Sequence, residues 1–198
     1  MCAIAPPTFA NSDKASTVLV LGDSISAAYG IQRETGWVAL LENRLAEQAS
    51  NFQVVNASIS GETTGGGLAR LPQALDLHNP SIVIIELGGN DGLRGYPIER
   101  IRENLQNIVT TADPNMRQII LVGMQIPPNY GRRYTDAFTQ LFQDIATEHN
   151  LKLVPFFMET VALKPELMQG DGIHPTAEAQ PMLLDTIWPL IVEALKEG

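Results

Sequence analysis

The chain has 198 residues, of which 44% are hydrophobic and 18% charged, so it can bury the core of one domain and is not disordered. A formal net charge of −9 excludes the basic surface that nucleic-acid binding requires. The same charge disfavours binding to anionic membranes, so any lipid substrate should be taken up one molecule at a time. The single cysteine excludes an intramolecular disulfide framework, and no apolar run approaches the roughly 20 residues of a membrane span.

The first 16 residues, MCAIAPPTFANSDKAS, are expected to form a flexible segment ahead of one domain at residues 17–198. Small residues around Phe9 resemble the cleavage-site end of a secretory signal, but the basic and apolar parts of a full signal are missing. A leader remnant would indicate a periplasmic or secreted bacterial protein, and an ordinary flexible start would indicate a cytoplasmic one. Both alternatives remain open.

Five short runs rich in β-branched residues predict strands at residues 17–21, 52–56, 82–87, 118–122 and 151–154. The first, third and fourth runs are almost continuously apolar, as is typical of strands covered on both faces. Apolar residues at helical spacing predict helices around 37–45, 68–75, 98–109, 138–145 and 177–196. Pro72 is expected near the start of its helix, and the last helix is expected to be interrupted or bent at Pro181 or Pro189. This alternation indicates an α/β fold with a mainly parallel sheet and helices on both faces.

The turn after the first strand reads GDSIS, residues 22–26. Ser24 is expected at a strand-to-helix turn, where the free N–H groups and the dipole of the helix start would favour an oxyanion. The alternative is that a polar side chain of this turn only caps the next helix. The string is not the Gly-x-Ser-x-Gly nucleophile elbow, because Ser26 occupies the position of the second glycine.

Glycine-rich turns follow the second and third strands. The segment NASISGETTGGG at 56–67 lacks the lysine of a phosphate-binding loop, so its glycines either permit a tight turn or let the Gly61 N–H approach a substrate. In ELGGNDG at 86–92, Asn90 and Asp91 are residue types typical of an ordinary turn. The segment also follows a predicted strand, and ligands of α/β sheets bind at the carboxyl ends of the strands. An Asn90 side chain at that edge would therefore also be placed to donate to an oxyanion beside Ser24.

The segment DGIHP, residues 171–175, lies in a loop before the last helix. The other two histidines, His78 and His149, are expected near the C-terminal ends of helices, where the helix dipole accounts for them. His174 follows Asp171 by three residues, so Asp171 can accept from one ring nitrogen while the other faces a serine. This pairing is typical of a hydrolytic triad.

Together these four segments resemble the SGNH hydrolases, also called the GDSL-type esterase/lipase family, whose motifs supply Ser, Gly, Asn and His in this order. Within that family the chain is similar to the bacterial multifunctional thioesterase I/lysophospholipase L1/arylesterase group. The resemblance covers residues 17–190 and includes GLARLP at 67–72, NYGRRY at 129–134 and VPFFMETVALKP at 154–165.

The resemblance implies that Ser24 is the nucleophile, His174 the general base and then acid, and Asp171 the carboxylate that orients the histidine. The backbone N–H groups of Ser24 and Gly61 and the side chain of Asn90 would form the oxyanion hole. The implied fold is a flavodoxin-like three-layer α/β/α sandwich with a five-stranded parallel sheet. No metal or organic cofactor is implied.

The implied function is hydrolysis of aryl and acyl esters, with thioesters and lysophospholipids as further substrates, by a protein expected to be a monomer. A carbohydrate acetylesterase of the same family is an alternative, and a non-catalytic anion-binding module with a flavodoxin-like fold is another. Apolar residues in the later loops are expected to border the substrate pocket. They are Gly92, Leu93, Tyr96, Ile126, Pro128 and Ile173.

Overall fold

The computed structural model describes residues 16–48, 51–113 and 117–197. Within these ranges five parallel strands form one sheet in the order β2-β1-β3-β4-β5. The strands are β1 (Ser16–Gly22), β2 (Phe52–Asn56), β3 (Ile82–Glu86), β4 (Gln118–Val122) and β5 (Lys152–Val154). All five predicted strands are confirmed, and the order is that of flavodoxin-like folds. The flexible segment expected at residues 1–16 lies outside the described residues except for Ser16, with which β1 begins.

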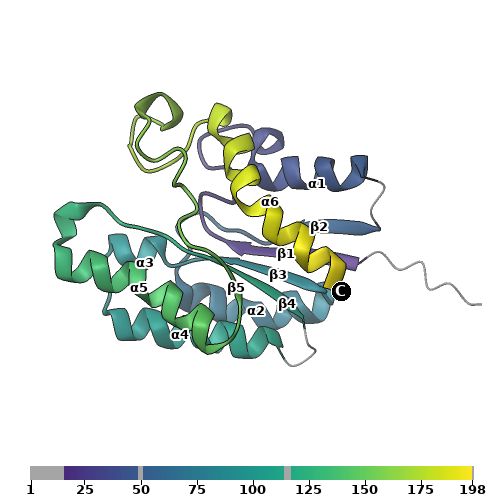
Figure 1. Ribbon diagram of the computed structural model, residues 1–198, viewed down its shortest axis with the longest axis horizontal. Coiled ribbons are helices and arrows are strands. Elements are labelled where there is room, and N and C mark those ends of the chain that lie inside the picture. The colour runs from purple at the N-terminus through teal and green to yellow at the C-terminus, as the bar shows by residue number, and fades with distance from the viewer. Residues whose placement is uncertain (1–15, 49–50, 114–116, 198) are drawn as a thin grey trace, which may run out of the picture.

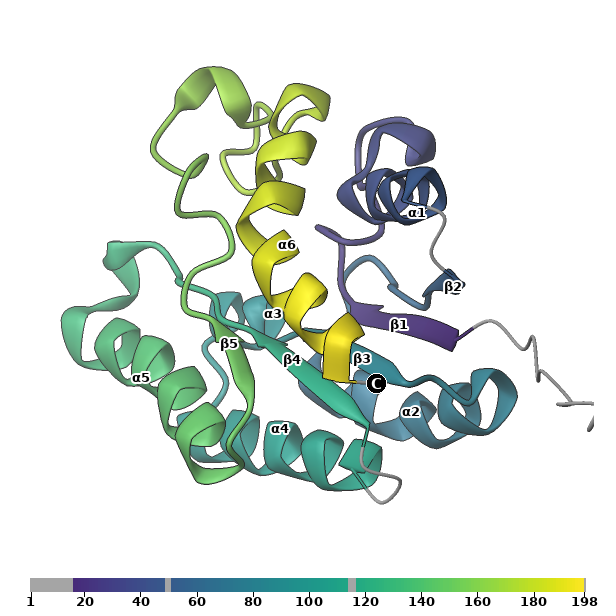
Figure 2. The same cartoon turned by 45° about the vertical axis from the view of Figure 1, so that its right-hand side comes forward.

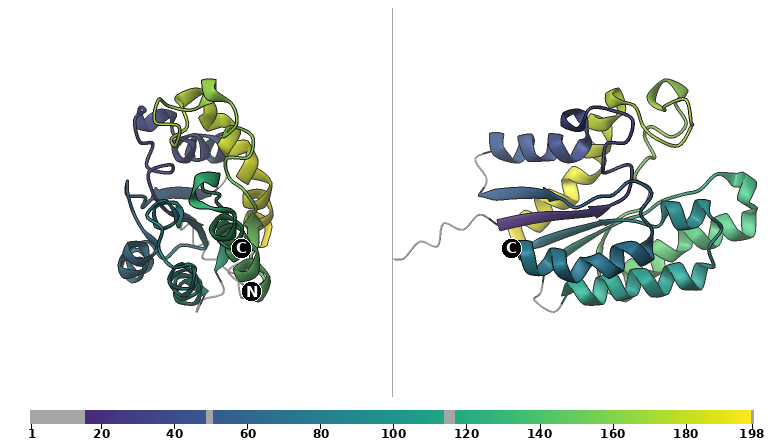
Figure 3. Two further views of the ribbon diagram at one scale, coloured as in Figure 1. Left: turned by 90° about the vertical axis from the view of Figure 1, so that its left-hand side faces the viewer. Right: turned by 180° about the vertical axis from the view of Figure 1, so that it is seen from behind.

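Two layers of helices cover the sheet (Figure 1). One layer contains α1 (Trp37–Glu47) and α6 (Gln180–Glu197), and the other contains α2 (Thr64–His78), α3 (Gly89–Leu93), α4 (Ile98–Ala112) and α5 (Arg132–Glu148). The same layers are seen from the side and from behind in Figure 3. Short 3-10 turns lie at Arg33–Thr35, Pro128–Tyr130, Pro165–Leu167 and Ala177–Ala179. The predicted three-layer α/β/α sandwich is confirmed.

The central strands are buried on both faces, which explains why their sequences do not alternate between apolar and polar residues. Along β3, the side chains of Val83 and Ile85 pack toward α2, α4 and α5, whereas Ile82 and Ile84 pack toward α1 and α6. All four are 0% exposed. The period of two along a strand therefore divides one apolar run between two separate cores.

Two helices accommodate prolines differently from what the sequence pattern predicts. We expected Pro72 near a helix start, but α2 already begins at Thr64 and continues to His78. We expected the last helix to be interrupted or bent at Pro181 or Pro189, but α6 begins at Gln180 and runs through both prolines without interruption. Pro72 and Pro189 lie on the exposed side of their helices, so water can hydrate the carbonyl that loses its N–H donor. Burial of the opposite face of each helix, which includes Leu71 and Ile191, outweighs the lost hydrogen bond.

No helix in the described part of the chain is long and apolar enough to cross a membrane.

Candidate active site

The polar residues singled out by the sequence meet at one end of the sheet, beyond the carboxyl ends of its strands. Figure 2 shows the long loop between β5 and α6 rising beside the loop between β1 and α1. The first of these loops carries Asp171 and His174, and the second carries Ser24. Residues separated by 150 positions in the chain are therefore within hydrogen-bonding distance.

Ser24, His174 and Asp171 form a continuous chain of hydrogen bonds. Nε2 of His174 lies 2.9 Å from Oγ of Ser24, and Nδ1 of His174 lies 2.6 Å from Oδ2 of Asp171. With Nδ1 protonated and donating to the carboxylate, Nε2 has its lone pair directed at the serine hydroxyl. This arrangement can remove a proton from Ser24 as its oxygen attacks an electrophile.

The Asp171 carboxylate is held by a local turn rather than by burial. Its Oδ1 accepts from the backbone N–H groups of Ile173 and His174 at 2.9 and 3.0 Å, and its side chain is 38% exposed. The hydrogen bonds from the backbone and ring of His174, followed by the one from Ile173, lower the pKa of Asp171 to about 2. Asp171 is therefore ionised at neutral pH and orients the imidazole.

The turn that carries Ser24 differs from the one we expected. Residues 24–30 form successive turns, and the next α-helix begins only at Trp37. Ser24 is therefore not at a helix N-terminus, and the expectation based on the helix dipole was wrong. The Ala27 N–H donates to the carbonyl of Asp23, which closes one helical turn, but Ala28 has a positive φ of 57°. That left-handed residue ends the turn before a helix can propagate. Ser24 itself is partly exposed.

Gly61 lies in the exposed loop after β2 and has a φ of 78°, a backbone conformation that glycine adopts without strain. This loop is tied to the end of β1 by Arg70 of α2, which donates to the carbonyls of Ala57 and Gly22 and pairs with Glu62 at 2.7 Å. Among the described residues, no backbone or side-chain acceptor is bound by the N–H of Ser24 or of Gly61. Both N–H groups are therefore available to a ligand.

Asn90 lies in α3, a helix of about one turn where the sequence predicted only a turn. Its Nδ2 donates to Oδ2 of Asp23 at 3.1 Å, which directs the amide toward the GDSIS turn and leaves its second N–H for a ligand. The adjacent Asp91 has a structural role, because its two carboxylate oxygens accept from the backbone N–H and hydroxyl of Thr64 at 2.9 and 2.7 Å. Asp91 thereby joins α3 to the start of α2.

The residues expected to border the pocket differ in exposure. Gly92 and Ile126 are buried beside Phe138, Leu93 and Tyr96 are partly buried, and Pro128 and Ile173 are exposed. Ile126 and Pro128 line a cavity of about 530 Å³ between the loop after β4 and α5. A contribution of these six residues to substrate binding remains a prediction.

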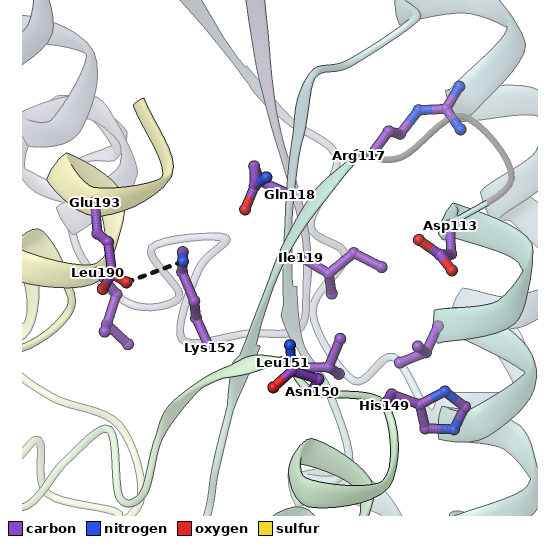
Figure 4. A pocket seen from close by; sticks show the side chains of 11 residues that line it. Asp113, Arg117, Gln118, Ile119, His149, Asn150, Leu151, Lys152, Leu190 and Glu193 are labelled. Carbon is purple, nitrogen blue, oxygen red and sulfur yellow. Dashed lines mark hydrogen bonds and ion pairs between the residues drawn. The ribbon is translucent and has the colours of Figure 1, made fainter. Parts of the chain in front are cut away.

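A larger cavity of about 720 Å³ lies at the opposite edge of the sheet (Figure 4). It is lined by the beginnings of β4 and β5 and by residues of α6 such as Glu193, which pairs with Lys152 at 3.1 Å. Because all strands are parallel, this edge is remote from the carboxyl ends that carry Ser24 and Asn90. We therefore assign the candidate site from its side-chain chemistry and not from cavity size.

No cluster of three or more His, Cys, Asp or Glu side chains suited to a metal ion occurs among the described residues.

Two residues that the sequence did not single out support His174. The Gln169 side-chain amide donates to the carbonyls of Tyr29 and Pro175 at 2.8 and 3.0 Å, and its backbone N–H donates to the carbonyl of His174 at 2.7 Å. The Tyr29 ring lies 4.5 Å from the His174 ring, between centroids, with a tilt of 40°. Gln169 thus connects the loop of the serine to the loop of the histidine. No local sequence signal could reveal it, because Tyr29 and Gln169 are 140 residues apart.

Comparisons with known proteins place these features in context. Residues 20–180 match the GDSL-like lipase/acylhydrolase family. The chain is 50% identical over 177 residues to the esterase TesA of Pseudomonas aeruginosa, with 89% of this chain and 88% of the relative covered. It is 46% identical over 171 residues to thioesterase 1/protease 1/lysophospholipase L1 of Escherichia coli strain K12, with 86% and 81% covered.

Among solved structures, the psychrotrophic esterase EstA from Pseudoalteromonas sp., inhibited by monoethylphosphonate, is similar in fold and sequence. It superimposes with a TM-score of 0.87 at 44% identity, covering 91% of this chain and 99% of that one.

Proposed function

The chain belongs to the GDSL-like lipase/acylhydrolase family, and on that premise we propose that it hydrolyses carboxylic esters through an acyl-enzyme on Ser24. The observation that carries the proposal is the chain of hydrogen bonds from Asp171 through His174 to Ser24, at 2.6 and 2.9 Å. Aryl and acyl esters are the primary substrates, and thioesters and lysophospholipids are further ones. The names of the relatives, an esterase and a thioesterase/lysophospholipase, support this range of substrates.

In the first step, Oγ of Ser24 bonds to the carbonyl carbon of the ester while Nε2 of His174 takes the hydroxyl proton. The carbonyl oxygen becomes an oxyanion, which accepts from the N–H groups of Ser24 and Gly61 and from the Asn90 amide. Collapse of this intermediate breaks the bond to the alcohol or thiol, which leaves with the proton from His174. Water then repeats the sequence on the acyl-enzyme and releases the acid.

The exposure of the site suits substrates that arrive singly from solution. Large exposed apolar side chains lie in the surrounding loops at Tyr29, Ile59, Tyr130 and Ile173, with exposed fractions of 51, 52, 37 and 39%. Tyr29 packs against the His174 ring and Ile173 directly precedes His174, so we expect these two to provide apolar contacts for an acyl or aryl group beside Ser24.

The test is hydrolysis of p-nitrophenyl esters from acetate to palmitate by the wild type and Ser24→Ala. We expect the variant to lose about 10⁴- to 10⁶-fold in kcat. Ser81→Ala, at the opposite edge of the sheet, is the matched control and should keep full activity. Equal rates for wild type and Ser24→Ala would refute the proposal and favour an anion-binding module. A steep preference for acetate would instead favour a carbohydrate acetylesterase.

A covalent probe tests the nucleophile directly. A p-nitrophenyl alkylphosphonate should release p-nitrophenolate as Oγ of Ser24 bonds to phosphorus, which adds the mass of the phosphonyl group to the intact protein. We expect this mass increase in the wild type and in Ser81→Ala but not in Ser24→Ala. Labelling of Ser24→Ala would place the nucleophile elsewhere.

A further inference from the structure

A chain of buried polar groups runs beneath the GDSIS turn and ends at the Asn90 amide. The Trp37 indole donates to Oγ of Ser26 at 3.2 Å, and Ser26 donates to Oε2 of Glu86 at 2.6 Å. Oε2 of Glu86 also accepts from the Asp23 N–H at 3.1 Å. Asp23 and Ser26 are each 2% exposed and Glu86 is 0% exposed, so bulk water does not reach this chain.

The hydrogen-bond pattern determines which carboxyl group carries a proton. Both oxygens of Asp23 accept, Oδ1 from the Ile25 N–H at 3.0 Å and Oδ2 from Asn90 at 3.1 Å. Oε1 of Glu86 is buried, and no N–H or O–H group among the described residues donates to it. The Glu86 and Asp23 carboxyl groups lie within hydrogen-bonding reach of each other, and two carboxyl groups can form such a bond only if one of them is protonated. Glu86 is then the donor and Asp23 the acceptor.

We propose that Glu86 is a neutral carboxylic acid that acts as a positioning residue, because it fixes Asp23 and thereby the oxyanion-stabilising amide of Asn90. This inference rests on the proposed function for the role of Asn90. The arrangement also explains the glycine before Asp23, since a Cβ at Gly22 would lie 2.7 Å from Oε2 of Glu86.

The electrostatics of the pair agree with this assignment. Burial, followed by the nearby Asp23 charge, raises the pKa of Glu86 well above its usual range. Burial also raises the pKa of Asp23, to about 6. Both shifts favour the retention of a proton by this pair. The other charged groups that face it are His174, which lowers the pKa of Asp23, and Arg70, which donates to the Gly22 carbonyl at 3.4 Å.

Glu86→Gln is the first test, because glutamine reproduces the neutral acid. Its oxygen can accept from Ser26 and the Asp23 N–H, and its NH₂ group can donate to the Asp23 carboxylate. We expect kcat within about 3-fold of the wild type, whereas Glu86→Leu should lower kcat about 100-fold with little change in KM. The exposed Glu103→Gln serves as the matched control. A loss of more than about 10-fold in kcat for Glu86→Gln would show that a charged Glu86 is needed and would overturn the inference.

A double-mutant cycle tests the link from Asp23 to Asn90. The Asp23 carboxylate accepts from the Ile25 N–H, the Asn90 amide and Glu86. Asp23→Asn leaves one side-chain oxygen for these three donors, so Asn90 loses its orientation and kcat should fall about 100-fold. Because both changes affect the same amide, the double variant with Asn90→Ala should be no slower than the slower single variant. Multiplicative losses in the double variant would mean that the two residues act independently and would refute the positioning role.

The pH dependence of stability provides a readout that does not require catalysis. The pKa of Glu86 is higher in the folded state than the 4.5 of the unfolded chain. The contribution of its bound proton to the free energy of unfolding is therefore fully present below pH 4.5 and is lost as the pH rises toward the folded-state pKa. Glutamine does not titrate, so the Tm of Glu86→Gln should increase relative to the wild type as the pH rises above 4.5. A Tm difference that does not change with pH would contradict a neutral Glu86.

These measurements distinguish the two proposals. Unchanged hydrolysis in Ser24→Ala and Asn90→Ala would remove the proposed function, while the pH-dependent Tm difference would still report the protonation of Glu86. Loss of hydrolysis in those two variants, together with an inactive Glu86→Gln, would remove only the inference about Glu86.

Discussion

The two halves of the candidate site are held in place by different means. The half with Ser24 and Asn90 rests on fully buried groups, of which Glu86 is 0% and Asp23 2% exposed. The half with His174 lies in a loop whose residues 170–173 are all partly or fully exposed, and it is shaped by backbone hydrogen bonds to Asp171. The geometry of the first half is therefore coupled to the stability of the core, whereas the geometry of the second is local and depends on a few surface contacts.

Among the substitutions that test this difference, Asp171→Asn is expected to have the largest effect on kcat. The amide can still accept from the backbone, but its NH₂ group would face Nδ1 of His174 and favour the wrong tautomer, so kcat should fall about 10⁴-fold. Because Asp171 is exposed and the amide keeps the backbone hydrogen bonds, the free energy of unfolding should fall by no more than about 1 kcal/mol, less than for a core substitution.

Measurement of kcat and of urea denaturation on the same preparation checks both parts of this prediction. Asp136→Asn, an exposed carboxylate on α5, is the control. A loss of stability as large as that of a core substitution would show that the two halves do not differ as described.

Asn90→Ala tests the buried half. Removal of one oxyanion donor should lower kcat about 10²- to 10³-fold and leave KM nearly unchanged, because the donor acts on the transition state. Steady-state kinetics with p-nitrophenyl butyrate provide the measurement, and Asn107→Ala on the exposed side of α4 provides the control. A loss below about 5-fold would remove Asn90 from the oxyanion hole.

Gln169→Leu should have a smaller effect. The substitution removes the side-chain hydrogen bonds to Tyr29 and Pro175 but keeps the backbone bond to His174, so we expect kcat to fall about 10-fold with the fold intact. The nearby, exposed Glu166→Gln is the control. If Gln169→Leu matches the wild type in kcat, the local turn at Asp171 is sufficient to place His174.

Much of the fold could be predicted from the sequence because its signals are local. The β-branched runs at 82–87 and 118–122 predict strands covered on both faces, and β3 and β4 lie there. The position of Pro72 was predicted incorrectly, because the cost of a proline inside a helix is set by what the rest of that helix buries. The placement of Ser24 at the start of the next helix was also predicted incorrectly, because α1 begins only at Trp37 and the segment between them contains Ala28 with a positive φ.

The chemistry of the candidate site was determined by the sequence itself. Residue types and order bring a serine, a glycine, an asparagine and an Asp-x-x-His pair to the carboxyl ends of parallel strands, and chain connectivity in such sheets places those ends together. The tertiary structure alone decided how these groups are held. Glu86 under the serine turn and Gln169 between the two loops act through contacts that span 60 and 140 residues. Periodicity and motif spacing describe only neighbours along the chain, so interactions of this kind appear only when the strands and loops are packed together.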